Sequence, residues 1–328
     1  MFKKLLIPIL ALTFFTNLAA QPVELGKVDW SRDHQEALRA SEKSGIPVLI
    51  LFQEVPGCGT CTGYGKDVLS HPLVVEAIES LFIPLCIYNN KGGKDREVLN
   101  HYKEPTWNNP VVRFVNFHTE DLVPRLAGDY TRYGLVSKMI SALTISGREV
   151  PGYLRLLEQE FYCERMPKET AYLSMYCFWS GEKVLGDMQG IAATEAGYMD
   201  GKEVVKVEFV PGMADFSDIV KNANRASCGD AVYTDDKDLA GSAVKVLGEN
   251  KVREEKSYRK DREDKYYLRK SDYRKIPMTP LQAQKVNSYL GQGKDPSVWL
   301  SPRQVKMYRK YKNDPTAEER WNNVWVLE

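Results

Sequence analysis

The sequence contains few of the residues that usually staple a small fold or build a metal site. Only six cysteines occur in 328 residues, which is too few for a scaffold held together by disulfides. The four histidines all precede residue 120, and none lies with two cysteines at the spacing of a zinc site. We therefore expect no metal ligand and no cofactor, and redox chemistry is the use that remains for a pair of exposed cysteines.

Long apolar runs are also scarce. The longest follows the basic start MFKK and ends at the small residues of TNLAA, and it is shorter than the ~20 residues that span a bilayer. This layout is typical of a secretory signal peptide at 1–20, and the alternative is an uncleaved membrane anchor. No cysteine follows the run to carry a lipid. We expect an extracytoplasmic protein, periplasmic or secreted, without stable membrane insertion after cleavage of the signal.

The net charge is only +1 and excludes no class of partner, because it averages unlike segments. From residue 249 onward, lysine and arginine alternate with tyrosine. Such interleaving occurs in nucleic-acid-binding proteins, but acidic residues interrupt the run and an exported protein meets little nucleic acid. We expect a solvated helical face or a wrap over the preceding domain, and no nucleic-acid partner.

The length predicts two domains with extensions. Between the signal peptide and residue 145, apolar runs of strand length alternate with helical stretches, which indicates an α/β domain with a largely parallel sheet. A linker with one short helix at 154–161 follows. The expected division is a signal peptide, a first domain, a linker, a second domain and a basic, tyrosine-rich extension, at 1–20, 21–145, 146–168, 169–248 and 249–328.

The second domain has a different pattern. Strand, helix, two strands and helix are expected in turn, and Asp200-Gly201 is expected to form the hairpin turn between the two strands, since glycine tolerates positive φ. This order predicts a two-layer α+β domain. The elements are expected at 170–176, 178–188, 191–198, 202–210 and 215–226.

The first motif that carries chemistry is Cys58-Gly59-Thr60-Cys61, placed after the buried run PVLILFQ and at the start of a helix. The positive end of the helix would stabilise a thiolate on Cys58 and lower its pKa. Cys61, one turn later, would then resolve a mixed disulfide. The alternatives are a permanent disulfide that staples the turn, or half of a zinc site.

Over roughly 28–143 the chain resembles the thioredoxin family. The resemblance rests on PVLILF, on CGTC and on Asn109-Pro110-Val111. It implies that Pro110 is a cis proline beside the cysteines and that the Asn109 backbone faces a bound substrate. Gly57 replaces the family's tryptophan and Thr60 its proline, so the direction of the redox reaction is left open.

The second motif is Cys177-Phe178-Trp179, again where a strand ends and a helix begins, a position that lowers the pKa of a thiol. The two aromatic side chains could form an apolar wall for a methyl group next to the sulfur under attack. The return strand supplies a carboxyl group at Glu203.

This region, about 171–226, resembles methionine sulfoxide reductase A, whose hallmark Gly-Cys-Phe-Trp-Gly precedes a Gly-Tyr and a Glu-Ala-Val strand. The resemblance implies that Cys177 attacks the sulfoxide sulfur and becomes a sulfenic acid. Phe178 and Trp179 would hold the methyl group, and Glu203, if kept protonated by burial, would give a proton to the oxygen.

Two departures from that family favour the alternative that Cys177 is an inert thiol. The segment before the Glu203 strand is shorter than usual and lacks a tyrosine that normally contacts the sulfoxide oxygen, and Tyr176 replaces a glycine. A tyrosine from 258–273 would be needed in its place.

A sulfenic acid at Cys177 needs a second thiol. Cys228 is the expected resolver, because Gly229 indicates a flexible loop; Cys163 is the alternative, and Cys86 is expected to be buried. The Cys58–Cys61 pair would be the reductant at high effective concentration.

The leading hypothesis is an exported, thiol-dependent reductase of methionine sulfoxide in proteins. Its partners would be oxidised or disulfide-containing proteins and an upstream thiol electron donor. The alternatives are a general thiol–disulfide oxidoreductase with an inactive second domain, and a non-enzymatic interaction protein.

Overall fold

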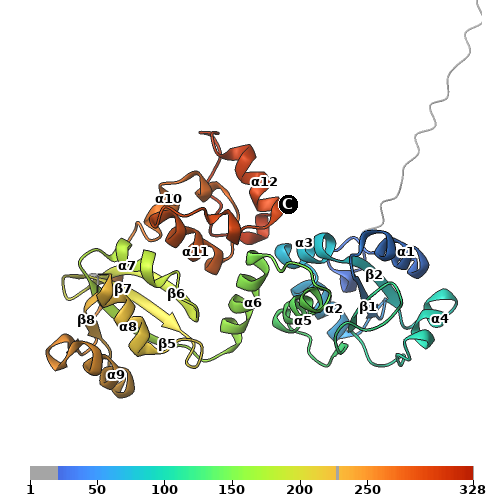
Figure 1. Ribbon diagram of the computed structural model, residues 1–328, viewed down its shortest axis with the longest axis horizontal. Helices are drawn as coiled ribbons and strands as arrows, with labels where there is room; N and C mark the ends of the chain where they lie inside the picture. Colours follow the sequence, from blue (N-terminus) through green and yellow to red (C-terminus); the bar gives the residue numbers. More distant parts are fainter. Residues whose placement is uncertain (1–20, 227–228, 328) are drawn as a thin grey trace, which may run out of the picture.

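The structure is a computed structural model that describes residues 21–226 and 229–327. The expected signal peptide lies outside the described residues. Two sheets, of four and six strands, form the centres of two separate α/β bodies, as Figure 1 shows. In the described part of the chain, every helix is too short or too polar to cross a membrane.

The first sheet has the strand order β2-β1-β3-β4. Its central strand pairs in parallel with β2 but antiparallel with β3, so the expectation of a largely parallel sheet is wrong. After β2 the chain passes through α4, which has eight residues, and enters β3 at the end of the sheet where β1 and β2 finish. The strands are β1 (Val48–Gln53), β2 (Ile83–Tyr88), β3 (Val111–Val115) and β4 (Leu126–Ala127).

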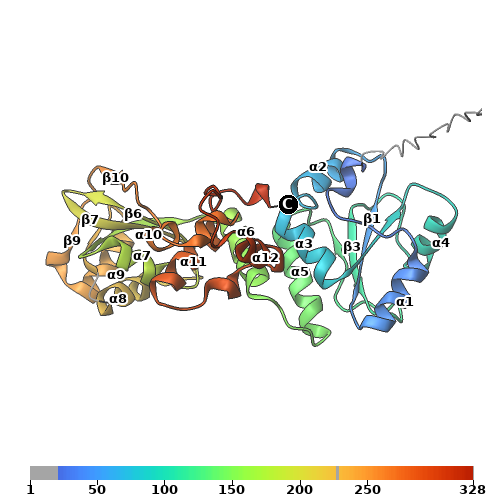
Figure 2. The ribbon, with the colours of Figure 1, turned by 90° about the horizontal axis from the view of Figure 1, so that it is seen from above.

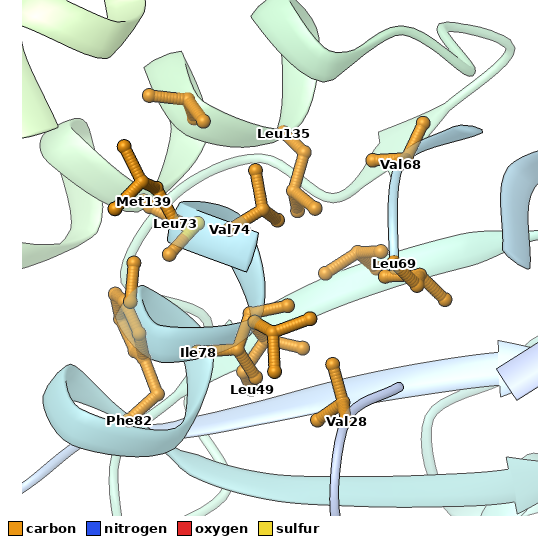
Figure 3. Close-up of a cluster of buried hydrophobic side chains, with 14 of the residues drawn as sticks. Val28, Leu49, Val68, Leu69, Leu73, Val74, Ile78, Phe82, Leu135 and Met139 are labelled. Atoms are coloured by element: carbon orange, nitrogen blue, oxygen red, sulfur yellow. The ribbon is translucent and has the colours of Figure 1, made fainter. Parts of the chain in front are cut away.

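Helices cover both faces of this sheet (Figure 2). On one face, Leu73 and Ile78 of α3 pack with Leu49 of β1 in a buried apolar cluster that also takes in Met139 of α5, as Figure 3 shows. All six residues of β1 are buried, as the continuous apolar run predicts. The helices are α1 (His34–Ser44), α2 (Gly59–Asp67), α3 (Pro72–Leu81), α4 (Lys94–His101) and α5 (Arg132–Ile145).

The expected linker is mostly one helix, α6 (Gly152–Arg165), longer than the short helix expected at 154–161. It is amphipathic rather than solvated all round: Leu154, Leu157 and Phe161 are buried in the first core. Such an apolar stripe forms a helix wherever neighbours can bury it. The linker is therefore a packed element and not a flexible tether.

The second sheet has the order β10-β6-β7-β5-β8-β9. Asp200 and Gly201 have φ of 50° and 69° and form the turn between β6 and β7, which confirms the predicted hairpin. The strands are β5 (Glu169–Met175), β6 (Ile191–Met199), β7 (Lys202–Phe209), β8 (Gly229–Tyr233), β9 (Val252–Arg253) and β10 (Tyr258–Lys260). The helices are α7 (Phe178–Leu185), α8 (Phe216–Arg225) and α9 (Lys237–Leu247).

One face of the second sheet packs on helices. Leu173 and Val205 share a buried cluster with Phe178 of α7 and Ile219 of α8. The two-layer arrangement expected for this domain is thus present in the structure, and nothing in its fold is specific to one enzyme family.

The chain after residue 248 contributes to both bodies. The strands β9 and β10 form the two edges of the second sheet, and a further buried cluster is built by residues after 260. Val324 and Leu327 belong to the buried cluster of the first domain, and Figure 2 shows α6 and α12 between the two sheets. The helices are α10 (Tyr266–Arg269), α11 (Pro280–Gly291) and α12 (Pro302–Tyr311). The division into five segments stays a prediction.

Candidate functional site

The first candidate site lies where β1 ends and α2 begins. Cys58 caps the first turn of α2 and is exposed, whereas Cys61 is 0% exposed. Their sulfur atoms are 3.9 Å apart and both thiols are free. The strand thus fixes the loop, and the helix places the two thiols one turn apart with only one of them accessible.

The two thiols differ in ionisation. The backbone N–H of Cys61 donates to the Cys58 sulfur and lowers the pKa of Cys58 below its usual value. Burial raises the pKa of Cys61 to about 11. At neutral pH the exposed sulfur is therefore the better nucleophile and the buried sulfur stays protonated, which is the assignment expected from the sequence.

Asn109 and Pro110 lie beside the buried thiol. The bond between them is cis, as the resemblance implies, and Pro110 is buried. The Cys61 thiol also donates to the side-chain Oδ1 of Asn109 at 2.9 Å, a contact that the sequence did not indicate. The side chain of Asn109 therefore orients the Cys61 thiol, while contact of the Asn109 backbone with a substrate stays a prediction.

Residue 57 must be a glycine because the chain at Glu54 and Cys61 comes very close to it. A Cβ at this position would lie 2.5 Å from the Glu54 carbonyl oxygen and 2.6 Å from the Cys61 Cβ. The N–H of Gly57 donates to Oε1 of the buried Glu24 at 2.8 Å. The loop before the motif is therefore folded tightly onto Cys61, and a bulky residue before Cys58 would not fit this loop.

The second candidate site lies where β5 ends and α7 begins. Cys177 is the N-cap residue of α7, is partly exposed, and is a free thiol. The side chain of Tyr176 is 90% exposed and points to solvent rather than over the sulfur. The bulky neighbour that replaces the family's glycine thus leaves the thiol partly exposed rather than buried.

Glu203 lies at the start of α7, beside the backbone of the residue that follows Cys177. Its Oε2 accepts a hydrogen bond from the backbone N–H of Phe178 at 2.9 Å, so the carboxyl group sits at the first turn of α7. The side chain is only partly buried, and the full burial expected for a proton donor is absent because Glu203 is the second residue of β7, next to the exposed turn at Asp200-Gly201. A substrate covering the site would have to complete its burial.

The expected aromatic wall is divided. Phe178 is 3% exposed and packs edge-on against Tyr198 with ring centroids 5.3 Å apart. Trp179 instead stacks on Tyr266 of α10, with centroids 4.0 Å apart. Tyr266 lies within 258–273, the stretch expected to supply the tyrosine that contacts the sulfoxide oxygen. No sequence spacing identifies Tyr266 among the tyrosines of that stretch.

A buried ionic cluster holds α10 against α7. The Nζ of Lys265 donates to Glu182 at 2.6 Å, to the Thr194 carbonyl at 2.5 Å and to Asp264 at 3.0 Å. Burial lowers the pKa of Lys265, but the two carboxylates outweigh it and keep the pKa above its usual value. The cluster fixes Lys265 beside Tyr266. Sequence reasoning missed it because Glu182 and Lys265 are 83 residues apart.

The three remaining cysteines of the chain are Cys86, Cys163 and Cys228. Cys86 is 0% exposed, as predicted, and Cys163 is 4% exposed on α6, so neither is accessible. Cys228 lies outside the described residues. Its neighbour Gly229 pairs with Met175, two residues before Cys177, and Gly229 is the buried start of β8 rather than part of an exposed loop. The reason for that glycine is space, since a Cβ there would lie 2.8 Å from the Cβ of Ala223.

The two cysteine centres lie in opposite halves of the molecule. In both ribbon views α2 and α7 are separated by α6 and the C-terminal helices (Figures 1 and 2). The structure therefore brings Cys58 together with Cys61, and Cys177 together with Glu203 and Phe178, but does not bring the two centres together.

The chain is similar to known redox proteins in its first domain. Residues 29–116 match the sequence model of a family described as thioredoxin-like. The thioredoxin-related protein DsbJ of Chlamydia pneumoniae is 30% identical over 75 residues, which are 23% of this chain and 22% of that protein. This chain therefore matches about a fifth of that relative's length.

Among solved structures, the protein titled DsbH Oxidoreductase is similar with 19% identity and a TM-score of 0.30, covering 38% of this chain and 90% of that one. The family model by itself places a thioredoxin-like domain at residues 29–116, which contain the CxxC motif.

Proposed function

We propose that the protein is a thiol-dependent oxidoreductase whose first centre, Cys58 and Cys61, exchanges electrons with disulfides in partner proteins. The main support is the arrangement of these thiols. Cys58 is exposed and its pKa is lowered, and the sulfur of the protonated Cys61 lies 3.9 Å from the sulfur of Cys58. The thioredoxin-like sequence of residues 29–116 and the names of the similar proteins agree with it.

The reaction is two successive thiol exchanges. The Cys58 thiolate attacks one sulfur of a substrate disulfide, forms a mixed disulfide and releases the other substrate sulfur as a thiolate. Cys61, after losing its proton to that thiolate, then attacks Cys58. The substrate leaves as one thiol and one thiolate, which takes up a proton from water, and Cys58 and Cys61 remain as a disulfide.

Reduction of insulin disulfides by the protein with dithiothreitol tests this centre. We expect Cys58→Ser to abolish turnover, and Cys61→Ser to accumulate a mixed disulfide with insulin that mass spectrometry detects. Cys163→Ser, a buried thiol elsewhere, is the control. Equal turnover by wild type and Cys58→Ser would refute the proposal, and it would favour a purely structural or interaction role for this domain.

A second centre is favoured by a separate observation. We propose that Cys177 reduces methionine sulfoxide in oxidised proteins, because this partly exposed thiol begins α7 and the carboxyl group of Glu203 accepts the N–H of the next residue, Phe178. The resemblance of the surrounding sequence to methionine sulfoxide reductase A supports the same reaction. Phe178, Trp179 and Tyr266 would then surround the methyl group of the substrate.

The reaction at Cys177 transfers an oxygen atom from the sulfoxide to the cysteine sulfur. The Cys177 thiol attacks the sulfoxide sulfur, the sulfoxide oxygen takes up the proton, and the products are a thioether and a cysteine sulfenic acid. A second thiol converts the sulfenic acid into a disulfide and releases water. We propose Cys228 for that role, because its neighbour Gly229 pairs with Met175 close to Cys177.

Reduction of a methionine-sulfoxide peptide with dithiothreitol tests the second centre. We expect Cys177→Ser to abolish turnover and Glu203→Gln, which keeps an acceptor for the Phe178 N–H, to lower kcat by about 100-fold or more. Glu208→Gln, farther along the same strand, is the matched control. No turnover by wild type would remove this proposal and leave the first centre standing.

We propose that electrons pass from the first centre to the second between molecules, because α2 and α7 lie in opposite halves of one chain. A mixture of Cys58→Ser and Cys177→Ser proteins tests this with an upstream thiol donor that reduces only the first centre. Recovered sulfoxide reduction that rises with the square of protein concentration is expected. Activity in wild type but not in the mixture would show that the transfer is within one chain.

We also propose an extracytoplasmic location, from the signal-like sequence at 1–20. Cell fractionation with sequencing of the mature N-terminus tests it, and a cytoplasmic protein that keeps Met1 would contradict it.

A further inference from the structure

A third side chain joins the two cysteines of the first centre. The carboxyl group of Glu54 and the sulfur atoms of Cys58 and Cys61 lie within 4.8 Å of one another. Glu54 follows the last residue of β1, and the tight loop through Gly57 turns the chain back so that residues 54 and 61 meet. Sequence spacing alone did not indicate this carboxylate as a neighbour of the motif.

These distances are close to those of a metal-binding site. With Zn–S bonds of about 2.3 Å and Zn–O bonds of about 2.1 Å, tetrahedral geometry separates two sulfur ligands by about 3.8 Å and a sulfur from an oxygen by about 3.6 Å. The two sulfur atoms are 3.9 Å apart, so they need almost no adjustment. The Glu54 oxygen needs to move by about 1 Å at most, which rotation of a partly exposed side chain allows.

The surroundings suit a cation. With both thiols deprotonated, the three donors carry three negative charges. The carboxyl group of Glu24 lies behind the same loop, where it accepts the N–H of Gly57. The amide of Asn109, now an acceptor for the Cys61 thiol at 2.9 Å, can turn by 180° and donate its N–H to a thiolate instead. Such outer hydrogen bonds orient and stabilise metal ligands.

We propose that the reduced protein binds one Zn²⁺ ion through Glu54, Cys58 and Cys61, with the fourth position open to water or to a partner's thiol. Cys58 lies at the surface and gives the ion a path from solvent. This site does not depend on the proposed reactions, and it departs from the expectation that the chain carries no metal ligand.

Zinc and oxidation exclude each other at this site. A Cys58–Cys61 disulfide has sulfur atoms about 2.05 Å apart and no thiolates, so the oxidised protein cannot supply the ligands. Binding by the reduced protein must release the thiol protons. The zinc-bound form would therefore be protected from oxidation, and its affinity would rise with pH.

Titration of the fully reduced, metal-free protein with Co²⁺ tests the site, because cobalt replaces zinc and reports its ligands by absorption. We expect one ion per chain, a thiolate-to-cobalt charge-transfer band, and intense visible bands of four-coordinate cobalt that Zn²⁺ displaces. The oxidised protein should bind no ion. A chelator competition then gives the zinc affinity.

Variants assign the ligands. We expect Cys58→Ser to abolish the charge-transfer spectrum of a two-thiolate site. Loss of an outer partner of a metal ligand typically costs about 10–100-fold in affinity, so Glu54→Gln, which removes a direct ligand, should weaken zinc binding at least tenfold. Glu36→Gln, an exposed carboxylate on α1, and Cys177→Ser, in the other centre, should bind as wild type does.

Three results would overturn the proposal. They are unchanged affinity in Glu54→Gln, loss of binding in Cys177→Ser, and equal binding by the oxidised protein. Circular dichroism of each variant confirms that a loss of binding is not a loss of fold. Insulin reduction by the zinc-free protein remains the separate test of the redox function.

Discussion

The two cysteines of the first centre should react with an alkylating reagent at very different rates. Cys58 is exposed and its thiolate accepts the N–H of Cys61, which lowers the pKa of Cys58. Cys61 is fully buried, and burial raises its pKa to about 11. Since the thiolate is the reactive form, the environment of each sulfur sets its rate.

The size of the difference follows from the ionised fractions at pH 7. A thiol with pKa of about 11 is ionised in about 1 molecule in 10,000, whereas an ordinary cysteine with pKa of about 8.5 is ionised in about 3 in 100. Ionisation alone therefore slows Cys61 by about 300-fold relative to an ordinary cysteine. Cys58, whose pKa is lowered, should react at least as fast as an ordinary exposed cysteine.

Iodoacetamide labelling of the reduced, metal-free protein, quenched at intervals and read by peptide mass spectrometry, measures both rates. Cys86 is the internal reference for a buried thiol, because burial raises its pKa to about 12. The labelling of Cys58 should level off at a lower pH than that of Cys61, whose rate should still be rising at pH 9. In Cys58→Ser, Cys61 should remain slow because its burial is unchanged.

The reasoning fails if Cys61 reacts within tenfold of Cys58 at pH 7. It also fails if the two rates share one pH midpoint, since the two sulfur atoms would then be equivalent. Either result would mean that the loop opens far enough to expose Cys61, and that accessibility rather than the folded environment decides which thiol attacks.

Three further predictions concern stability, each measured by urea unfolding. Gly57→Ala should destabilise the protein by about 1–3 kcal/mol through overpacking against Glu54 and Cys61, whereas Gly63→Ala in α2, where nothing lies within 4 Å, should gain about 1 kcal/mol; equal effects would contradict the close approach. Lys265→Met should lower the free energy of unfolding by about 3–5 kcal/mol by leaving buried carboxylates unpaired. Adding Glu182→Gln should recover part of this stability if the unpaired carboxylate is the cause. Burial raises the pKa of Glu160 from 4.5 to about 7. Its stabilising contribution is therefore complete below pH 4.5 and lost as pH rises through about 7, a fall of up to about 3 kcal/mol that Glu160→Gln should flatten.

The sequence predicts local features well where a pattern is complete in a short stretch. The apolar run of β1, the hairpin at Asp200-Gly201 and the N-cap position of Cys177 each depend on a few neighbouring residues, and each is present in the structure. The pairing of Cys58 with Cys61 and the cis bond before Pro110 follow from a motif and a family resemblance.

Contacts between distant residues could not be predicted. Strand direction in the first sheet depends on the end of the sheet at which the chain enters β3, which a local sequence pattern does not encode. The stacking of Trp179 on Tyr266 and the bonds of Lys265 to Glu182 join segments more than 80 residues apart. Glu54 was overlooked for another reason: a single carboxylate four residues before a cysteine becomes a neighbour only when Gly57 lets the loop fold back.

The packing of Val324 and Leu327 into the first core has a consequence for anyone who wishes to work with that domain alone. Both side chains are almost fully buried there, at 6% and 7% exposure, and burial of each apolar side chain is worth about 1.5–3 kcal/mol. A fragment that stops at residue 145 would lose the packing of these two side chains and expose the apolar surface that they cover. Since whole domains are stable by only about 5–15 kcal/mol, the excised thioredoxin-like domain should have a lower free energy of unfolding than it has in the intact chain. It should also be more prone to aggregate.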